Sequence, residues 1–267
     1  MKRFFILLNI ALLAVACKNA PKEPAVDYSK FGGSLGNVEM IVENEYAAVF
    51  NGNSYDAGLL LGTAYDFFDE DGNQIKHQYA GPDGNIKYTV LSQYADGVLV
   101  SETNNDDFIG YDLTLSEKKE DGTRVNEIKY KNPSSGTATL HVKDSADVTT
   151  TNRYNRFDQL QRRFIDKKNL YGQIIEHVDY LFFNGNQSEP RITKYVYENQ
   201  LLLREDAIES LKGGNVLYEY TSFDETGNWL TRIEKHDQAI GYPGNIEVHN
   251  IIRTRSYTYR KAGTEGK

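Results

Sequence analysis

The chain has 267 residues, a formal net charge of −8 and one cysteine. The negative charge argues against a nucleic-acid surface, which requires clustered positive charge. A single cysteine cannot form a disulfide within the chain, so the fold must be held by its core and its backbone hydrogen bonds.

Residues 1–16 have the pattern of a secretory signal peptide. A basic start precedes an apolar stretch that is shorter than the roughly 20 residues of a membrane helix. Small residues at 14–16 lead directly to Cys17, the only cysteine. This resembles the bacterial lipobox, whose cysteine is acylated, although Ala14 stands where leucine is usual. We therefore predict lipidation of Cys17 and attachment to a membrane through it; an ordinary cleaved signal is the alternative.

The next segment, residues 17–36, is polar and contains two prolines and a glycine-rich end. Such a composition predicts a flexible tether between the lipidated cysteine and a folded domain. From residue 37 the pattern changes to strands. The first candidates are 38–42 and 46–50, followed by a turn at 51–53.

Between residues 65 and 259 a short phrase recurs: an aromatic residue, Asp, two variable residues, Gly-Asn, an apolar residue and a basic residue. It is clearest at 68–76 (FDEDGNQIK) and 223–232 (FDETGNWLTR). Gly-Asn and Asp-Gly readily adopt the positive φ angles of a tight reversal, and alternating residues follow. The Asp can accept amide hydrogens of the turn. Each phrase therefore predicts the tip of a β-hairpin.

A chain of hairpin tips predicts an all-β fold. We expect an antiparallel meander of repeated β-hairpins over 37–261, forming a large twisted or curled sheet, with partial closure as the alternative to an open edge. Residues 262–267 are predicted to be a frayed tail. Residues 204–211 have helical spacing, but a helix this short is marginal and we do not predict one.

These phrases resemble the YD repeats of Rhs-type and teneurin proteins. The resemblance extends over 65–259 with a gap in the middle, and the whole chain is similar to small YD-repeat lipoproteins of Bacteroides-type bacteria. In the large relatives, long arrays enclose a toxin or form an adhesion module. This chain has too few units to enclose a cargo, so the resemblance implies the repetitive sheet and not the shell function.

Motifs for catalysis or metal binding are weak. The string GGSLG at 32–36 lacks the strand and helix that flank a nucleophile elbow. A calcium-like loop starting at Asp69 has Ala80 where the twelfth-position Glu belongs. The five histidines lack the spacing of a helical metal site. We therefore predict no catalytic residue, no metal and no cofactor, with an envelope enzyme such as a glycosidase as an alternative.

Aromatic residues offer the best candidate for a binding surface. Alternation on neighbouring strands would stack them in a ladder on one side of the sheet, although β-sheets also use Tyr and Phe simply for packing. The candidate ligand-binding residues are Tyr195, Tyr197, Tyr218, Tyr220 and Trp229.

Together, these features predict a non-catalytic binding or interaction module in the bacterial cell envelope. We expect an outer-membrane lipoprotein with a glycan or an envelope protein as ligand; a purely structural envelope component is the remaining alternative. The residues after Cys17 lack the acidic run that accompanies surface export in some relatives, which favours the periplasmic face without excluding the cell surface.

Overall fold

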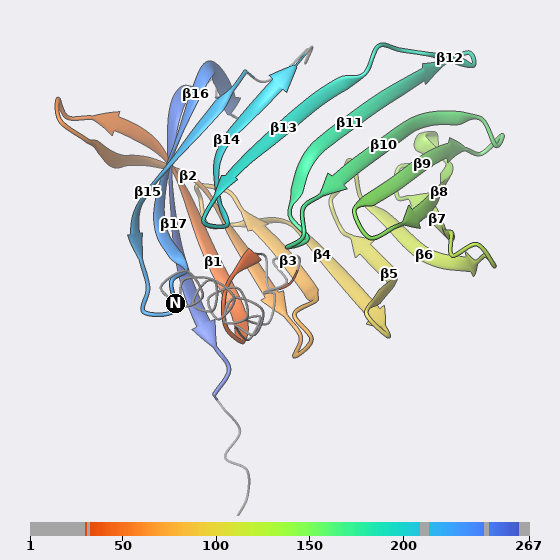
Figure 1. Ribbon diagram of the computed structural model, residues 1–267, viewed down its shortest axis with the longest axis horizontal. Helices are drawn as coiled ribbons and strands as arrows, with labels where there is room; N and C mark the ends of the chain where they lie inside the picture. The colour runs from red at the N-terminus through yellow and green to blue at the C-terminus, as the bar shows by residue number, and fades with distance from the viewer. Residues whose placement is uncertain (1–29, 31–32, 209–213, 243–245, 262–267) are drawn as a thin grey trace, which may run out of the picture.

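A computed structural model describes residues 30, 33–208, 214–242 and 246–261. The predicted signal peptide, Cys17, most of the tether and the predicted tail lie outside these described residues. Figure 1 shows strands throughout the described chain.

The strands follow one another with short turns between them. A 3₁₀ turn, η2 (Pro133–Ser135), lies between β7 and β8. In chain order the strands are β1 (Val38–Phe50), β2 (Tyr55–Phe68), β3 (Gln74–Ala80), β4 (Ile86–Ala95), β5 (Val98–Asn104), β6 (Tyr111–Lys118), β7 (Arg124–Tyr130), β8 (Thr137–Asp144), β9 (Val148–Asn155), β10 (Leu160–Lys168), β11 (Ile174–Phe183), β12 (Asn186–Gln187), β13 (Arg191–Glu198), β14 (Leu201–Ile208), β15 (Val216–Phe223), β16 (Trp229–Tyr242) and β17 (Ile246–Tyr259).

Two local expectations can be compared directly with these bounds. The two strands expected at 38–42 and 46–50 are one strand, β1, since the polar residues between them continue the alternation. Residues 204–208, at the start of the segment with helical spacing, belong to β14.

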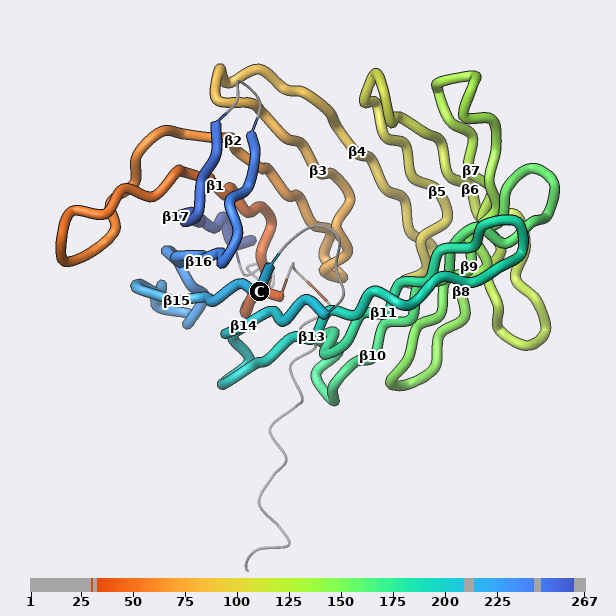
Figure 2. The backbone as a smooth tube through the Cα atoms, turned by 90° about the horizontal axis from the view of Figure 1, so that it is seen from above, coloured from red at the N-terminus to blue at the C-terminus, as the bar shows by residue number. Residues whose placement is uncertain are grey.

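The sheet closes on itself. Strands pair antiparallel with their neighbours along the chain, and β11 pairs with β13 past the two-residue strand β12. The first strand, β1, pairs with both β2 and β17. All the strands except the short β12 therefore form a barrel of 16 strands. Figure 2 shows the ring from above. The predicted all-β meander of hairpins is thus confirmed, and of the two arrangements considered the sheet adopts the closed one.

Turn chemistry of the repeated phrase is as expected. Gly72 and Gly227 lie at reversals with φ angles of 78° and 94°. The Asp69 carboxylate accepts a hydrogen bond from the Asn73 amide at 2.8 Å, and Asp224 accepts one from the amide of Asn228 at the same distance. The aspartate therefore closes the turn that the glycine makes sterically accessible.

We predict that Gly227→Ala will lower the free energy of unfolding by about 1 kcal/mol, because alanine is strained at this positive φ. The added Cβ would meet only Leu35 at 3.6 Å, so steric overlap adds little. Gly241→Ala is the matched control, since Gly241 lies in β16 without a positive φ and a Cβ there meets nothing within 4 Å. Urea unfolding measures both variants, and an equal loss in the two would contradict this account.

Hydrophobic packing is divided among separate clusters of the wall. The buried members of the three clusters are Val38, Ile41 and Phe68; Leu61, Val248 and Ile251; and Leu113, Ile128 and Ala138. Polar and aromatic side chains line other parts of the inner wall.

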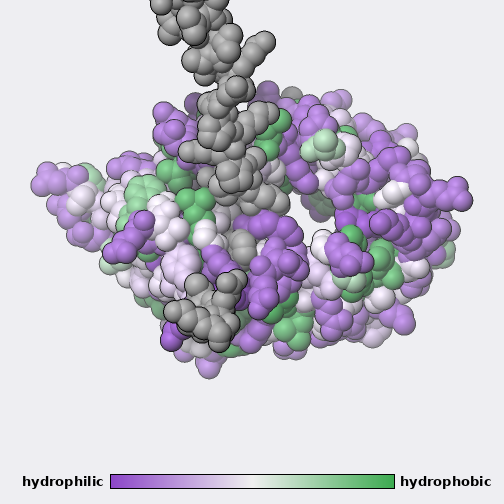
Figure 3. Space-filling model, turned by 60° about the horizontal axis from the view of Figure 1, so that its bottom comes forward, coloured by the Kyte–Doolittle hydropathy of each residue, from purple (hydrophilic) through white to green (hydrophobic). Residues whose placement is uncertain are grey.

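Successive residues of each strand point alternately into the ring and outward. The outward positions carry ion pairs such as Lys167–Glu176 at 2.5 Å and Lys235–Glu219 at 2.6 Å. On the face that Figure 3 draws, hydrophilic residues predominate among those described, with hydrophobic residues scattered between them. Among the described residues, no helix is long and apolar enough to cross a lipid bilayer.

The packed chain begins before the predicted boundary at residue 37. Leu35 donates its backbone amide to the Asn228 side chain at 2.5 Å, and Asn228 donates back to the Leu35 carbonyl at 2.9 Å. Asn228 also donates to the Tyr259 hydroxyl at 2.7 Å, and Ser34 is buried. The end of the predicted tether (17–36) is therefore fixed to the barrel by a turn residue of the last repeat.

The junction between β14 and β15, called the β14–β15 seam below, is narrow. Its register contains two residue pairs, Arg204 with Leu217 and Glu205 with Val216. Side chains bridge it further: Tyr218 donates its hydroxyl to Glu205 at 2.5 Å, and Tyr220 donates to the Leu202 carbonyl at 2.9 Å.

Candidate functional site

An open groove of about 530 Å³ runs along the inner wall from the end of β10 to β17, and it is called the inner groove below. It combines aromatic rings, aliphatic side chains, amides and cations. Its described lining residues are Gly33, Lys168, Gly172, Gln173, Ile174, Tyr195, Tyr197, Gln200, Leu201, Leu202, Tyr220, Trp229, Arg232 and Arg255.

The structure brings most of the predicted aromatic ladder to this groove. Tyr195, Tyr197, Tyr220 and Trp229 line it, while Tyr218 lies beside it at the β14–β15 seam. The Tyr197 hydroxyl donates to the Ile174 carbonyl at 3.0 Å. Because the sheet closes, the ladder faces the interior of the barrel and not an outer platform.

Trp229 differs from the tyrosines in its surroundings. Its side chain is buried, with 8% of the residue exposed. The guanidinium groups of Arg232 and Arg255 lie 4.6 and 4.1 Å from its ring centre. These cation–π contacts hold both arginines at the groove. Trp229 therefore positions the arginines, while the rings of the half-buried tyrosines are accessible to a ligand.

The described lining of the inner groove contains three cations and no carboxylate. Arg232 forms an ion pair with Glu234 at 2.5 Å, and Arg255 forms one with Glu43 at 2.6 Å, but neither glutamate is among the described lining residues. Lys168 makes no ion pair with any described residue, whereas its neighbour Lys167 pairs with Glu176. Positive charge is therefore oriented toward the groove.

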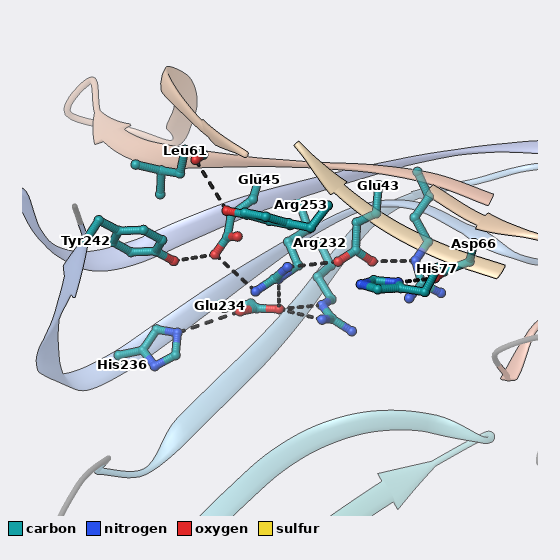
Figure 4. A network of polar contacts seen from close by, with 12 residues as sticks. Glu43, Glu45, Leu61, Asp66, His77, Arg232, Glu234, His236, Tyr242 and Arg253 are labelled. Carbon is teal, nitrogen blue, oxygen red and sulfur yellow. Dashed lines mark hydrogen bonds and ion pairs between the residues drawn. The ribbon is translucent and has the colours of Figure 1, made fainter. Parts of the chain in front are cut away.

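Beside the groove, on the same inner face of the barrel, lies a network of ion pairs centred on Arg253 (Figure 4). Arg253 contacts Glu234 at 2.7 Å, Glu43 at 2.8 Å and Glu45 at 3.1 Å. Figure 4 shows these side chains between their own wall and pale teal strands across the ring. The network balances three carboxylates against three guanidinium groups: Glu43, Glu45, Glu234, Arg232, Arg253 and Arg255.

The network also lowers the pKa of two of its carboxyl groups, Glu234 and Glu43. Burial alone would raise the pKa of Glu234, but the neighbouring His236 imidazole and the charges of Arg232 and Arg253 lower it to about 2. For Glu43, burial is likewise outweighed by Arg255 and Arg253, so its pKa is lowered. Burial and a hydrogen bond to Glu45 raise the pKa of Tyr242. Glu234 and Glu43 therefore stay ionised at neutral pH and act as counterions.

A second depression, of about 430 Å³, lies over β2–β6 and contains Asp66, His77 and Glu102. His77 Nδ1 lies 2.6 Å from Asp66, and its Nε2 lies 3.3 Å from the Tyr88 hydroxyl. This order of groups resembles a catalytic relay. Burial and the charges of Asp106 and Asp66 raise the pKa of Tyr88, so its hydroxyl is protonated at neutral pH.

The Asp–His pair recurs in a second repeat. His177 Nδ1 lies 2.6 Å from Asp166, in the same register relation as His77 and Asp66. In both repeats the histidine follows its aspartate by eleven residues across the hairpin turn. This eleven-residue spacing is visible in the sequence, but it differs from the three- or four-residue spacing that indicates a helical metal site. Within the described residues, no group of three or more His, Cys, Asp or Glu side chains could hold a metal ion.

Comparisons with known proteins provide little further information. No protein-family model matches the sequence, and no curated protein matches it significantly. Among solved structures, the chain is similar to a porin-like protein from Bacteroides uniformis, with 10% identity and a TM-score of 0.43. The match covers 83% of this chain and 98% of that one. A similarity at this level carries no functional conclusion.

Proposed function

We propose that the protein is a non-catalytic, glycan-binding lipoprotein of the bacterial cell envelope. In this proposal Cys17 carries the lipid anchor to the outer membrane, and the barrel presents the inner groove to its ligand. The N-terminal sequence pattern supports this localisation. The observation that supports binding is the row of half-buried tyrosines, Tyr195, Tyr197 and Tyr220, along an open groove.

Tyrosine rings and amides suit sugar recognition. The apolar face of a pyranose ring stacks on an aromatic ring, while amides and cations bond its hydroxyl groups. Tyr197 and Tyr220 are fixed by their hydroxyl bonds to Ile174 and Leu202. Rings held in place before binding lose little conformational entropy when a ligand stacks on them.

A glycan array probed with the full-length protein, followed by calorimetry on the best oligosaccharide, tests this proposal. We expect Tyr195→Ala to weaken that binding about tenfold, since it removes a stacking ring from the groove. Tyr180→Ala is the control, because Tyr180 alternates with inward-facing Asp179 and points outward from β11.

Two results would oppose the proposal. An array without binding above background would favour the purely structural role. Equal losses for the two tyrosine variants would place the binding surface outside the inner groove.

A further inference from the structure

The inner groove is asymmetric in charge. Its lining presents the cations Lys168, Arg232 and Arg255, and its described part contains no carboxylate. The glutamates that balance the two arginines lie beside them on the same inner face of the barrel, but they are not among the described lining residues of the groove. A ligand lying in the groove therefore contacts the two arginines and not their counterions.

Arg255 keeps hydrogen-bonding capacity for such a ligand. Its Nε donates to Glu43 at 2.6 Å, and its guanidinium carbon lies over the Trp229 ring, 4.1 Å from the ring centre. Among the described residues, the Arg255 side chain donates hydrogen bonds through Nε alone. The two terminal nitrogens can therefore form a fork toward a planar or tetrahedral anion.

Lys168 adds a cation without a counterion among the described residues. It is the last residue of β10, and its backbone amide donates to the Asp147 carbonyl at 2.7 Å, which fixes the base of the side chain. Inside a partly enclosed wall, charges interact more strongly than in bulk water, so an uncompensated ammonium there attracts an anion.

We propose that the inner groove selects sugars that carry an acidic group. This inference rests on the proposed glycan-binding function: the tyrosines stack the sugar rings, and Lys168 and Arg255 bind the acid. The shared ligand chemistry is an anionic substituent on a pyranose, either a carboxylate or a sulfate.

Calorimetric titration of the full-length protein with three oligosaccharide sets of matched length tests the inference. The sets are uronic-acid oligomers, sulfated oligomers and neutral oligomers. We expect at least one acidic set to bind about tenfold more tightly than the neutral set, with the difference shrinking at high salt. Preference for the uronic acids or for the sulfated sugars identifies the acid.

Adjacent lysines provide a matched pair of variants. Lys168→Gln should lower affinity for the acidic sugar about tenfold and lower affinity for the neutral sugar much less, because it removes one facing charge but keeps a polar side chain. Lys167→Gln changes the net charge equally but on the outer side of β10, where Lys167 pairs with Glu176. It should leave both affinities unchanged.

The outcomes separate this inference from the proposed function. Equal affinity for acidic and neutral sugars, with no effect of Lys168→Gln, would overturn acid selection while leaving glycan binding in place. Equal losses of affinity for the acidic sugar in the two lysine variants would show a long-range charge effect, and this result would also overturn acid selection by the groove. Failure of all three sets to bind, in agreement with a blank array, would overturn both.

Discussion

Arg253→Met is expected to lower the free energy of unfolding by about 3–5 kcal/mol, the cost of removing one partner from a buried ion network. Arg253 is the only described residue that contacts all of Glu43, Glu45 and Glu234. Without it, these carboxylates keep their burial and lose their shared counterion. Urea unfolding followed by circular dichroism measures the loss.

Two further variants sharpen this measurement. Arg204→Met removes an arginine that is half exposed and pairs with Asp206 on the outer side, and it should cost less than about 1 kcal/mol. Arg253→Lys retains the charge but not the three-way fork, so we expect an intermediate loss. Similar values for Arg253→Met and Arg204→Met would show that the network does not hold the wall together.

Acid should unfold the barrel through the same network. The pKa of Glu234 is about 2 in the folded protein and 4.5 without its surroundings. A carboxyl with a lowered folded pKa stabilises the fold above its unfolded pKa, and this contribution disappears as the pH falls toward the folded value. Between pH 5 and pH 2, Glu234 should account for a loss of roughly 3 kcal/mol.

Unfolding free energies measured from pH 7 to pH 2 check this expectation. Glu234→Gln should flatten the acid limb of the curve, because the titrating group is gone. Glu219→Gln removes an outward carboxylate that is 55% exposed and paired with Lys235, so its curve should follow the wild type. Superimposable curves for wild type and Glu234→Gln would rule out Glu234 as the source of acid sensitivity.

Local features of the fold were predictable because their causes are local. Gly72 and Gly227 lie at the expected reversals, since Gly-Asn and Asp-Gly determine a turn within five residues. Closure depends instead on the pairing of β1 with β17, whose strands are at opposite ends of the sequence. Arg253 and Glu43, which that pairing brings together, are 210 residues apart. No short-range pattern indicates such a contact.

Candidate-site residues were predictable to a similar extent. Strand alternation predicts that Tyr195 and Tyr197 share one side, and the structure agrees, but alternation does not say whether that side is inner or outer. Lys167 and Lys168 illustrate the same limit: one of two adjacent lysines must face inward, and only the closed ring decides which.

A ring also restricts how this molecule can change over evolution. An open array can gain or lose one hairpin at a time, because its first and last strands do not pair and any unit can therefore be the last one. Here, deleting a hairpin would leave β1 and β17 unable to meet without a new tilt and stagger of every remaining strand. The number of hairpins should therefore be the same in all relatives of this protein. Variation should be confined to the lengths of the turns and to the residues that face the ligand.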